Sequence, residues 1–282
     1  MATLYNPTRD IVKRFDSPED YAAHLERNCK GYVHDYGGDD WQGYDWNKAL
    51  RVLREGDLTN VAAAEKIIAD MHDANIFSSG IPLPVRSVVG YSPCVPAAIT
   101  GHPRSMYTRN RSETLSLNSP ISIYVETTVS AGVSHSELMS RGIAVLAFAM
   151  AMNITRPVSL YTASIGKPNS SSSGSVVRIN TSPMDLGRAA YMLTNASYCR
   201  QLAFAAMKEA APYGRQSNYI SWPWDMMPRD GVYQASMREM LGMEGDDVLI
   251  YGGHLFDDLM RTNPVQWVKD MLAKHSGNQE GE

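Results

Sequence analysis

One stretch, residues 120–166, constrains the fold more than any other part of the sequence. Its first part, residues 121–126, alternates apolar and larger or polar side chains, which is the period-two pattern of a strand. Ser134 and Glu137 then form an S-x-x-E capping box, which predicts the start of a helix. Residues 138–152 are almost wholly apolar, so we expect this helix to be buried on most sides.

The second half of the stretch predicts how this helix is connected. Pro157 interrupts the helical pattern, because proline cannot continue the backbone ladder and restrains the residue before it. Residues 158–165 read as a second strand, and residues 176–179 as a third that returns antiparallel to it. Strand, helix and strand in this order form a βαβ unit, which requires parallel pairing. The expected fold class is therefore α/β, with a mainly parallel sheet flanked by helices.

Composition limits the class of protein and its location. The chain has 282 residues, of which 44% are hydrophobic and 20% charged, so it can bury a sizeable core. A net charge of -4 argues against a strongly basic protein but leaves room for a local basic groove. Cys29, Cys94 and Cys199 lie far apart, which suits a reducing compartment. With no signal peptide and no apolar run long enough to span a bilayer, we expect a cytoplasmic protein without membrane contact.

The remaining patterns divide the chain into three parts. Residues 1–80 form a helical N-terminal section, residues 81–275 an α/β core domain and residues 276–282 a disordered tail. The expected N-terminal helices begin near Ser17, Trp46 and Asn60. In the core, further elements are expected as a strand over 85–91, a helix from Ser182 that breaks near Asn195, a helix over 232–241, a strand over 247–251 and a last helix after Asn263.

The order of the core elements and one short motif resemble the von Willebrand factor A family. That family carries D-x-S-x-S at the end of its first strand, and here Glu126, Thr128 and Ser130 occupy the matching positions. The resemblance implies a von Willebrand A-like sheet and a site for a divalent cation such as Mg²⁺, which prefers oxygen ligands. The family's other ligand positions have changed, to Met184 and Tyr251. The alternative interpretation of the motif is a polar strand end with solvated side chains.

A second set of residues combines cations with aromatic rings. Single-stranded nucleic acids are bound by cations that follow the phosphates and by aromatic faces on which bases stack. A loop over 104–111, the serine-rich tip after the second strand and a long loop over 212–230 supply both ingredients. The alternative is that the tryptophans fill the core under a long loop and that the arginines are ordinary surface residues. The predicted nucleic-acid-binding residues are Arg104, Tyr107, Arg109, Arg111, Lys167, Arg215, Tyr219 and Trp222.

Further short motifs resemble proteins of tailed bacteriophages. They are a W-x-G segment at Trp41 and Gly43, a G-x-P-x-x-M segment at residues 101–106, and the apolar helix that follows Ser134. Among proteins of this size, the chain is similar to the family of single-stranded-DNA-binding RNA polymerase cofactors called Drc. The resemblance implies a role in replication and transcription in the host bacterial cytoplasm, with RNA polymerase as a partner.

Enzyme motifs do not stand out in the sequence. The sequence contains no P-loop, Rossmann glycine motif or H-E-x-x-H pattern. Its histidines belong to no motif that would pair a nucleophile with a general base. Paired aspartates would suit a nuclease, but such pairs are more often helix caps and surface charge. We therefore expect a phage-encoded, non-catalytic single-stranded-DNA-binding protein without a cofactor. The sequence leaves open whether the protein forms a homo-oligomer. The alternative function is a von Willebrand A-like protein-interaction module that serves an ATPase or a virion partner.

Overall fold

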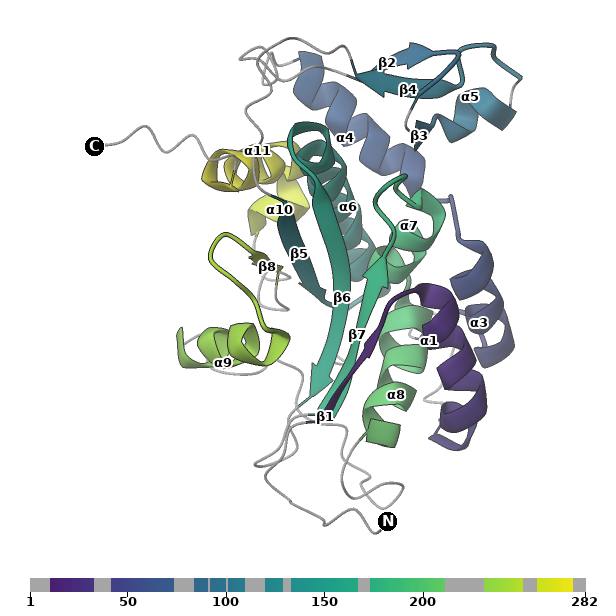
Figure 1. Cartoon of the computed structure of the whole chain (residues 1–282), viewed down its shortest axis with the longest axis vertical. Helices are drawn as coiled ribbons and strands as arrows, with labels where there is room; N and C mark the ends of the chain where they lie inside the picture. Colours follow the sequence, from purple (N-terminus) through teal and green to yellow (C-terminus); the bar gives the residue numbers. More distant parts are fainter. Residues whose placement is uncertain are drawn as a thin grey trace.

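A five-stranded sheet forms the centre of the protein in the computed structural model (Figure 1). Its strand order is β1-β7-β6-β5-β8, and every pair is parallel except β6 and β7, which are antiparallel. The strands are β1 (Ile11–Phe15), β5 (Ile121–Glu126), β6 (Val158–Gly166), β7 (Ser173–Ile179) and β8 (Val248–Ile250). The structure describes residues 11–32, 42–73, 84–90, 92–99, 101–109, 120–128, 133–166, 173–210, 231–250 and 258–275.

The mainly parallel α/β sheet predicted from residues 120–166 is confirmed. β5 and β6 pair in parallel with Ile121 opposite Val158, and α6 (His135–Thr155) connects them. The capping box is present in full: the amide of Glu137 donates to the Ser134 hydroxyl over 3.2 Å, and the Ser134 amide donates to the Glu137 carboxylate over 2.8 Å. These two bonds satisfy amides that the first turn of a helix otherwise leaves without partners.

The two faces of the sheet are covered unequally. Ile123 of β5 faces the large core, which contains α6 and most of the other helices, whereas its neighbour Tyr124 faces a smaller cluster. In that smaller cluster, Met237 and Leu241 of α9 (Gly231–Leu241) pack near Tyr124. The alternation along β5 therefore separates two apolar layers, as expected for a strand buried on both faces.

The remaining helices pack around α6 and the first face of the sheet. α6 contacts α4, α7, α10 and α11, while α8 lies against β7 and β6. The two segments η1 and η3 have π-helical hydrogen bonding, and η2 is a short 3-10 helix. The bounds of these helical segments are α1 (Pro18–His24), η1 (Leu25–Cys29), η2 (Lys30–Tyr32), α3 (Trp46–Glu55), α4 (Val61–Asp73), α7 (Leu186–Thr194), η3 (Ser197–Leu202), α8 (Ala203–Ala210), α10 (Asp258–Thr262) and α11 (Pro264–His275).

The N-terminal part contains an element that the sequence patterns did not predict. Residues 11–15 form strand β1, which pairs with β7 at one edge of the central sheet. The predicted helices α1, α3 and α4 follow, and Tyr21, Leu53 and Ala64 from them are buried in the same core as α6. The first part of the chain is thus integrated into the α/β core.

Two predicted elements are corrected by the structure. The helix expected from Ser182 begins at Leu186, because the Asp185 side chain accepts the Arg188 amide and caps it. The strand expected over 85–91 is shorter, β2 (Pro84–Ser87), and belongs to a separate three-stranded sheet. The break near Asn195 and the cap at Asn263 are confirmed.

The prediction that no apolar run is long enough to span a bilayer is wrong, because helix α6 has the length and composition of a membrane span. Its residues 135–154 are apolar enough to cross a bilayer, but 67% of that window is buried inside the protein. This burial is typical of the core helix of a soluble protein.

Candidate nucleic-acid interface

A small antiparallel sheet projects from the α/β core at the upper right of Figure 1. It has the order β2-β4-β3, with β3 (Ser92–Pro93), α5 (Val95–Ile99) and β4 (Met106–Arg109) following β2. We call residues 84–109 the small-sheet lobe. Part of the segment expected as a basic loop over 104–111 is therefore the central strand of this sheet.

Glycine is required where the lobe turns back on its central strand. A Cβ atom added to Gly90 would lie 1.9 Å from the backbone oxygen of Tyr107. Only a residue without a side chain fits such a close approach between two backbones. The β2–β3 turn can therefore close over β4 because position 90 is glycine.

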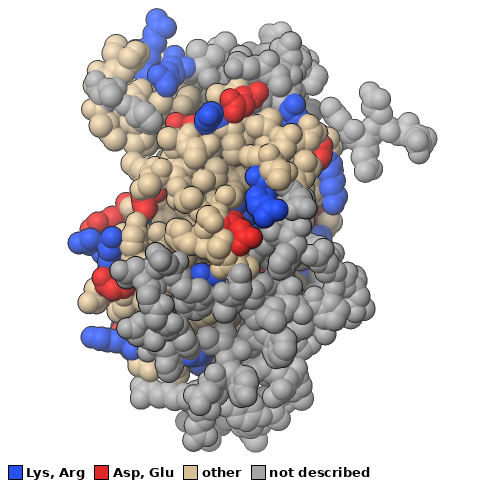
Figure 2. Space-filling view, turned by 180° about the vertical axis from the view of Figure 1, so that it is seen from behind, with Lys and Arg blue, Asp and Glu red and all other residues tan. Residues whose placement is uncertain are grey.

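The lobe is basic although the whole chain is acidic. Between Pro84 and Arg109 the sequence contains three arginines and no aspartate or glutamate, whereas the chain as a whole has a net charge of -4. Arg86 and Arg104 are exposed, and Lys and Arg atoms gather at the outer end of the lobe, at the upper left of Figure 2. Such a local concentration of positive charge attracts polyanions even when the net charge is negative.

Apolar side chains are also exposed on the lobe. Val88 and Val89 in the β2–β3 turn are 67% and 77% exposed, and Ile99 at the end of α5 is 76% exposed. Isolated exposed apolar residues are ordinary, but three on one small element form a candidate contact surface.

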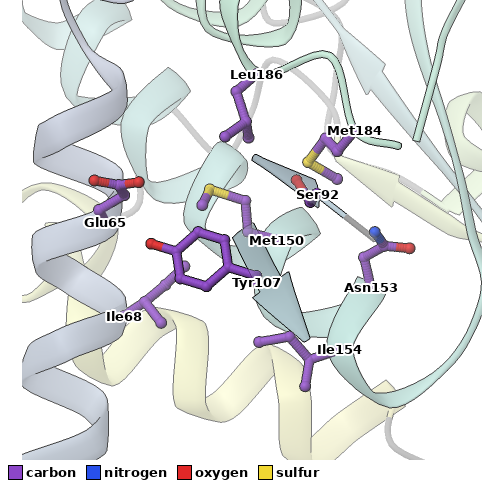
Figure 3. A pocket seen from close by; sticks show the side chains of 9 residues that line it. All are labelled: Glu65, Ile68, Ser92, Tyr107, Met150, Asn153, Ile154, Met184 and Leu186. Carbon is purple, nitrogen blue, oxygen red and sulfur yellow. The ribbon is translucent and has the colours of Figure 1, made fainter. Parts of the chain in front are cut away.

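A cavity of about 110 Å³ lies between the lobe, α4, α6 and the segment before α7 (Figure 3). Its wall is mainly apolar, with a few polar groups. Ligand cavities commonly combine an apolar lining with a small number of polar groups. The lining residues are Glu65, Ile68, Ser92, Tyr107, Met150, Asn153, Ile154, Met184 and Leu186.

Two titratable groups in the cavity have shifted pKa values. Burial raises the pKa of Glu65 above its ordinary value, and the nearby Arg86 opposes this shift. Burial also raises the pKa of Tyr107, as does the hydrogen bond between its hydroxyl and the Cys94 thiol. The Tyr107 hydroxyl points toward α4, the helix that carries Glu65 (Figure 3). The cavity thus holds a carboxyl group whose charged form is disfavoured, beside a neutral phenol.

The structure brings some of the predicted nucleic-acid-binding residues together and leaves others outside the described parts of the chain. Arg104, Tyr107 and the backbone of Arg109 belong to the lobe, with Arg104 exposed and Tyr107 half-buried. The sequence analysis did not identify Arg86, which register places opposite Tyr107. The predicted nucleic-acid-binding residues that lie outside the described ranges are Arg111, Lys167, Arg215, Tyr219 and Trp222.

Two of the three residues that match the von Willebrand ion motif, Glu126 and Thr128, are buried, so the interpretation as a solvated strand end is wrong for these two. Glu126 and Thr128 are both 0% exposed. The Arg141 guanidinium donates to the backbone oxygens of Glu126 over 2.7 Å and Ile250 over 3.4 Å, so it joins the ends of β5 and β8. The Thr128 hydroxyl donates to the sulfur of Met207 over 3.8 Å.

Among the ion-motif positions that the structure describes, Met184 lies far from Glu126. Met184 lies beside Asn153 and Ile154 near the end of α6, whereas Glu126 is bonded by Arg141 near its start. Twelve residues of helix separate Arg141 from Asn153, which corresponds to about 18 Å along the axis. Ser130 and Tyr251 lie outside the described residues.

Together, the fold and the lobe define an α/β protein with a basic, partly apolar projection beside a small cavity. Residues 4–267 match a family model described as "Domain of unknown function (DUF7192)", and the chain belongs to this family. No curated protein and no solved structure matches the chain. The resemblances to von Willebrand factor A proteins and to phage proteins therefore stay predictions.

Proposed function

We propose that this protein is a phage-encoded, non-catalytic single-stranded-DNA-binding protein that acts in replication or transcription in the host bacterial cytoplasm. The observation that supports it is the small-sheet lobe, where three arginines and no acidic residue stand in a chain of net charge -4. Phosphate contacts provide most of the affinity of sequence-independent binding, and they require this kind of local positive charge. Contact with RNA polymerase is part of the proposal, from the resemblance to the Drc family.

In the proposed mode of binding, Arg86 and Arg104 contact phosphates, and Tyr107 contacts a base. Arg86 lies on β2, opposite Tyr107, and Arg104 lies two residues before β4, which carries Tyr107. The Tyr107 ring lines the cavity. A cavity of about 150 Å³ holds a benzene ring, so this smaller one would admit only part of a base. Arg109, Arg111, Lys167, Arg215, Tyr219 and Trp222 would extend the contact along the strand.

The decisive experiment is a fluorescence-anisotropy titration with labelled oligothymidine at several salt concentrations. For single strands, log Kd changes with log salt by about 0.7 per phosphate contact, so exchanging Arg86 and Arg104 for glutamine should lower this slope by roughly 1.4. The control exchanges Arg51 and Arg178, two exposed arginines outside the lobe, and should leave the slope unchanged. Failure to bind at low salt, or binding that does not depend on salt, would refute the proposal.

The exposed apolar residues favour a second function, a protein-interaction module that serves an ATPase or a virion partner. Val88, Val89 and Ile99 would form the contact. Aliphatic side chains make no hydrogen bonds or ion pairs with phosphates, so they suit a protein partner better than DNA. Pull-down after nuclease treatment separates the two functions, because a protein contact survives removal of DNA. Exchange of Val88 and Val89 for serine should abolish recovery of the partner and leave oligothymidine binding intact.

A further inference from the structure

A group of metal-ligating side chains lies away from the lobe, between α1, η1 and α8. It consists of His24, Cys29 and Glu209, whose ligand atoms all lie within 4.8 Å of one another. Cys29 is fully buried, while the side chains of His24 and Glu209 are 14% and 18% exposed. One side of the group is therefore open to solvent, which a metal site needs as an entry path.

The π-helical segment η1 explains why His24 and Cys29 lie together. In a regular α-helix of 3.6 residues per turn, residues five apart point about 140° away from each other. η1 spans Leu25–Cys29 with π-helical bonding, in which each bond joins residues five apart, and this wider turn brings the two side chains to one side. π-helical turns occur frequently at functional sites.

The donor atoms select one class of metal ion. An imidazole nitrogen, a thiolate and a carboxylate oxygen suit Zn²⁺, which binds all three types. Mg²⁺ and Ca²⁺ prefer oxygen ligands alone. Three protein ligands with water in the fourth position form an open zinc site.

The surrounding contacts provide partners for the ligands. Lys13 Nζ lies 2.6 Å from Glu209 Oε1 and 2.5 Å from Oε2, and Asn28 Nδ2 lies 3.0 Å from His24 Nδ1. A metal that takes Oε2 leaves Lys13 on Oε1, so the ligating carboxylate keeps a hydrogen bond, as is usual in metal sites. The Zn²⁺ charge is balanced by the thiolate and the carboxylate.

We propose that His24 Nε2, Cys29 Sγ and Glu209 Oε2 form a Zn²⁺ site that fastens the π-helical end of α1 to α8. His24 Nε2 is 3.2 Å from Glu209 Oε2, at hydrogen-bond distance. On metal binding the imidazole keeps one proton, now on Nδ1. After the Asn28 amide rotates, its Oδ1 accepts a hydrogen bond from this Nδ1–H. The thiol of Cys29 loses its proton to buffer, so one proton is released for each Zn²⁺ bound.

The test uses the full chain after treatment with a chelator. Isothermal titration with Zn²⁺ in two buffers of different ionisation enthalpy should give one site per chain and release of about one proton. Co²⁺ in place of Zn²⁺ should give a near-ultraviolet sulfur-to-metal charge-transfer band, which requires a thiolate ligand. Binding should also raise the melting temperature with increasing Zn²⁺, since the metal binds the folded state.

Matched variants identify the ligands. Cys29→Ser should remove the Co²⁺ band and weaken Zn²⁺ binding at least tenfold, whereas Cys94→Ser, at a buried cysteine in the lobe, should change neither. His24→Asn, at a partly exposed position, gives the same test if Cys29→Ser does not fold. Absence of a Co²⁺ band in the wild type, or equal Zn²⁺ affinity in wild type and His24→Asn, would overturn the proposal and leave Lys13, His24 and Glu209 as an ion-pair network.

Discussion

The β5–α6–β6 unit and the small-sheet lobe differ in how far their apolar side chains are exposed to solvent. Ile123, Leu146 and Phe148 in the unit are fully buried, whereas Val89 and Ile99 in the lobe are 77% and 76% exposed. Burial of apolar area is the main source of stability, and exposed apolar area is available for contacts. The comparison indicates that the unit provides most of the stability of the fold, whereas the lobe keeps apolar area exposed at its surface.

The largest effect is expected in the unit. Phe148→Ala should lower the free energy of unfolding by roughly 4 kcal/mol, because it leaves a cavity in a well-packed core. Phe148 is fully buried and packs edge-on against Trp267, with ring centroids 6.0 Å apart. Urea unfolding followed by circular dichroism measures the change, and Val89→Ala in the lobe should shift it by less than about 0.5 kcal/mol. Similar losses for both variants would contradict the comparison.

An intermediate effect, confined to the lobe, is expected from Gly90→Ala. The added Cβ would meet the Tyr107 backbone oxygen at 1.9 Å, so β4 must move, at a cost of roughly 2 kcal/mol. Hydrogen exchange should become faster for lobe amides and stay unchanged in β5 and β6, with oligothymidine binding weakened. Gly245→Ala is the control, since a Cβ there has no atom within 4 Å. Faster exchange throughout the sheet would show that the lobe also stabilises the core.

A smaller effect is expected at the start of α6. Ser134→Ala removes the hydroxyl that accepts the Glu137 amide, and loss of such a cap costs about 1 kcal/mol. The midpoint of urea unfolding reports the loss. Ser136→Ala, in the first turn of the same helix, removes a hydroxyl that lies 3.1 Å from the Ser134 hydroxyl but accepts no backbone amide there, and it should cost less than half as much. Equal losses would show that the capping box contributes nothing specific.

The smallest effect concerns Glu65, which lies between the unit and the lobe. Burial raises its pKa above the ordinary value of 4.5, so on raising the pH the unfolded chain releases this proton before the folded chain does. The stability that Glu65 contributes is present below pH 4.5 and is lost as the pH rises through its pKa in the folded state. Glu65→Gln should therefore gain stability relative to wild type between pH 4 and pH 7, to be measured by urea midpoints at each pH. A difference that is constant with pH would show that Glu65 is solvated, and exposed Glu55→Gln serves as the control.

The sequence predicts the unit well because each local signal there agrees with its burial. The alternation in β5, the Ser134 capping box and the Pro157 break all depend on neighbours within a few residues. The lobe was predicted less well, because Met106–Arg109 is too short and too polar to show strand periodicity. The cavity was not predicted at all, since Glu65 and Tyr107 meet only through the packing of α4 against the lobe.

The group of His24, Cys29 and Glu209 also has no local sequence pattern, because these residues come together only in the folded chain. His24 and Cys29 have an unusual spacing for a helix, and only the π-helical turn brings them together. Glu209 joins them from a helix far along the chain. A search for ligand pairs at α-helical spacing would have missed them.

The edge strand β1 has a consequence for the order in which the chain can fold during synthesis. Ile11 pairs with Ser173, more than 150 positions later, so β1 lacks this partner until β7 has been made. Pairings of such high sequence separation form slowly, and unpaired strand edges favour aggregation of nascent chains. Fragments that stop before residue 173 should therefore lack a docking place for β1, and this edge of the sheet can form only after β7 has been made.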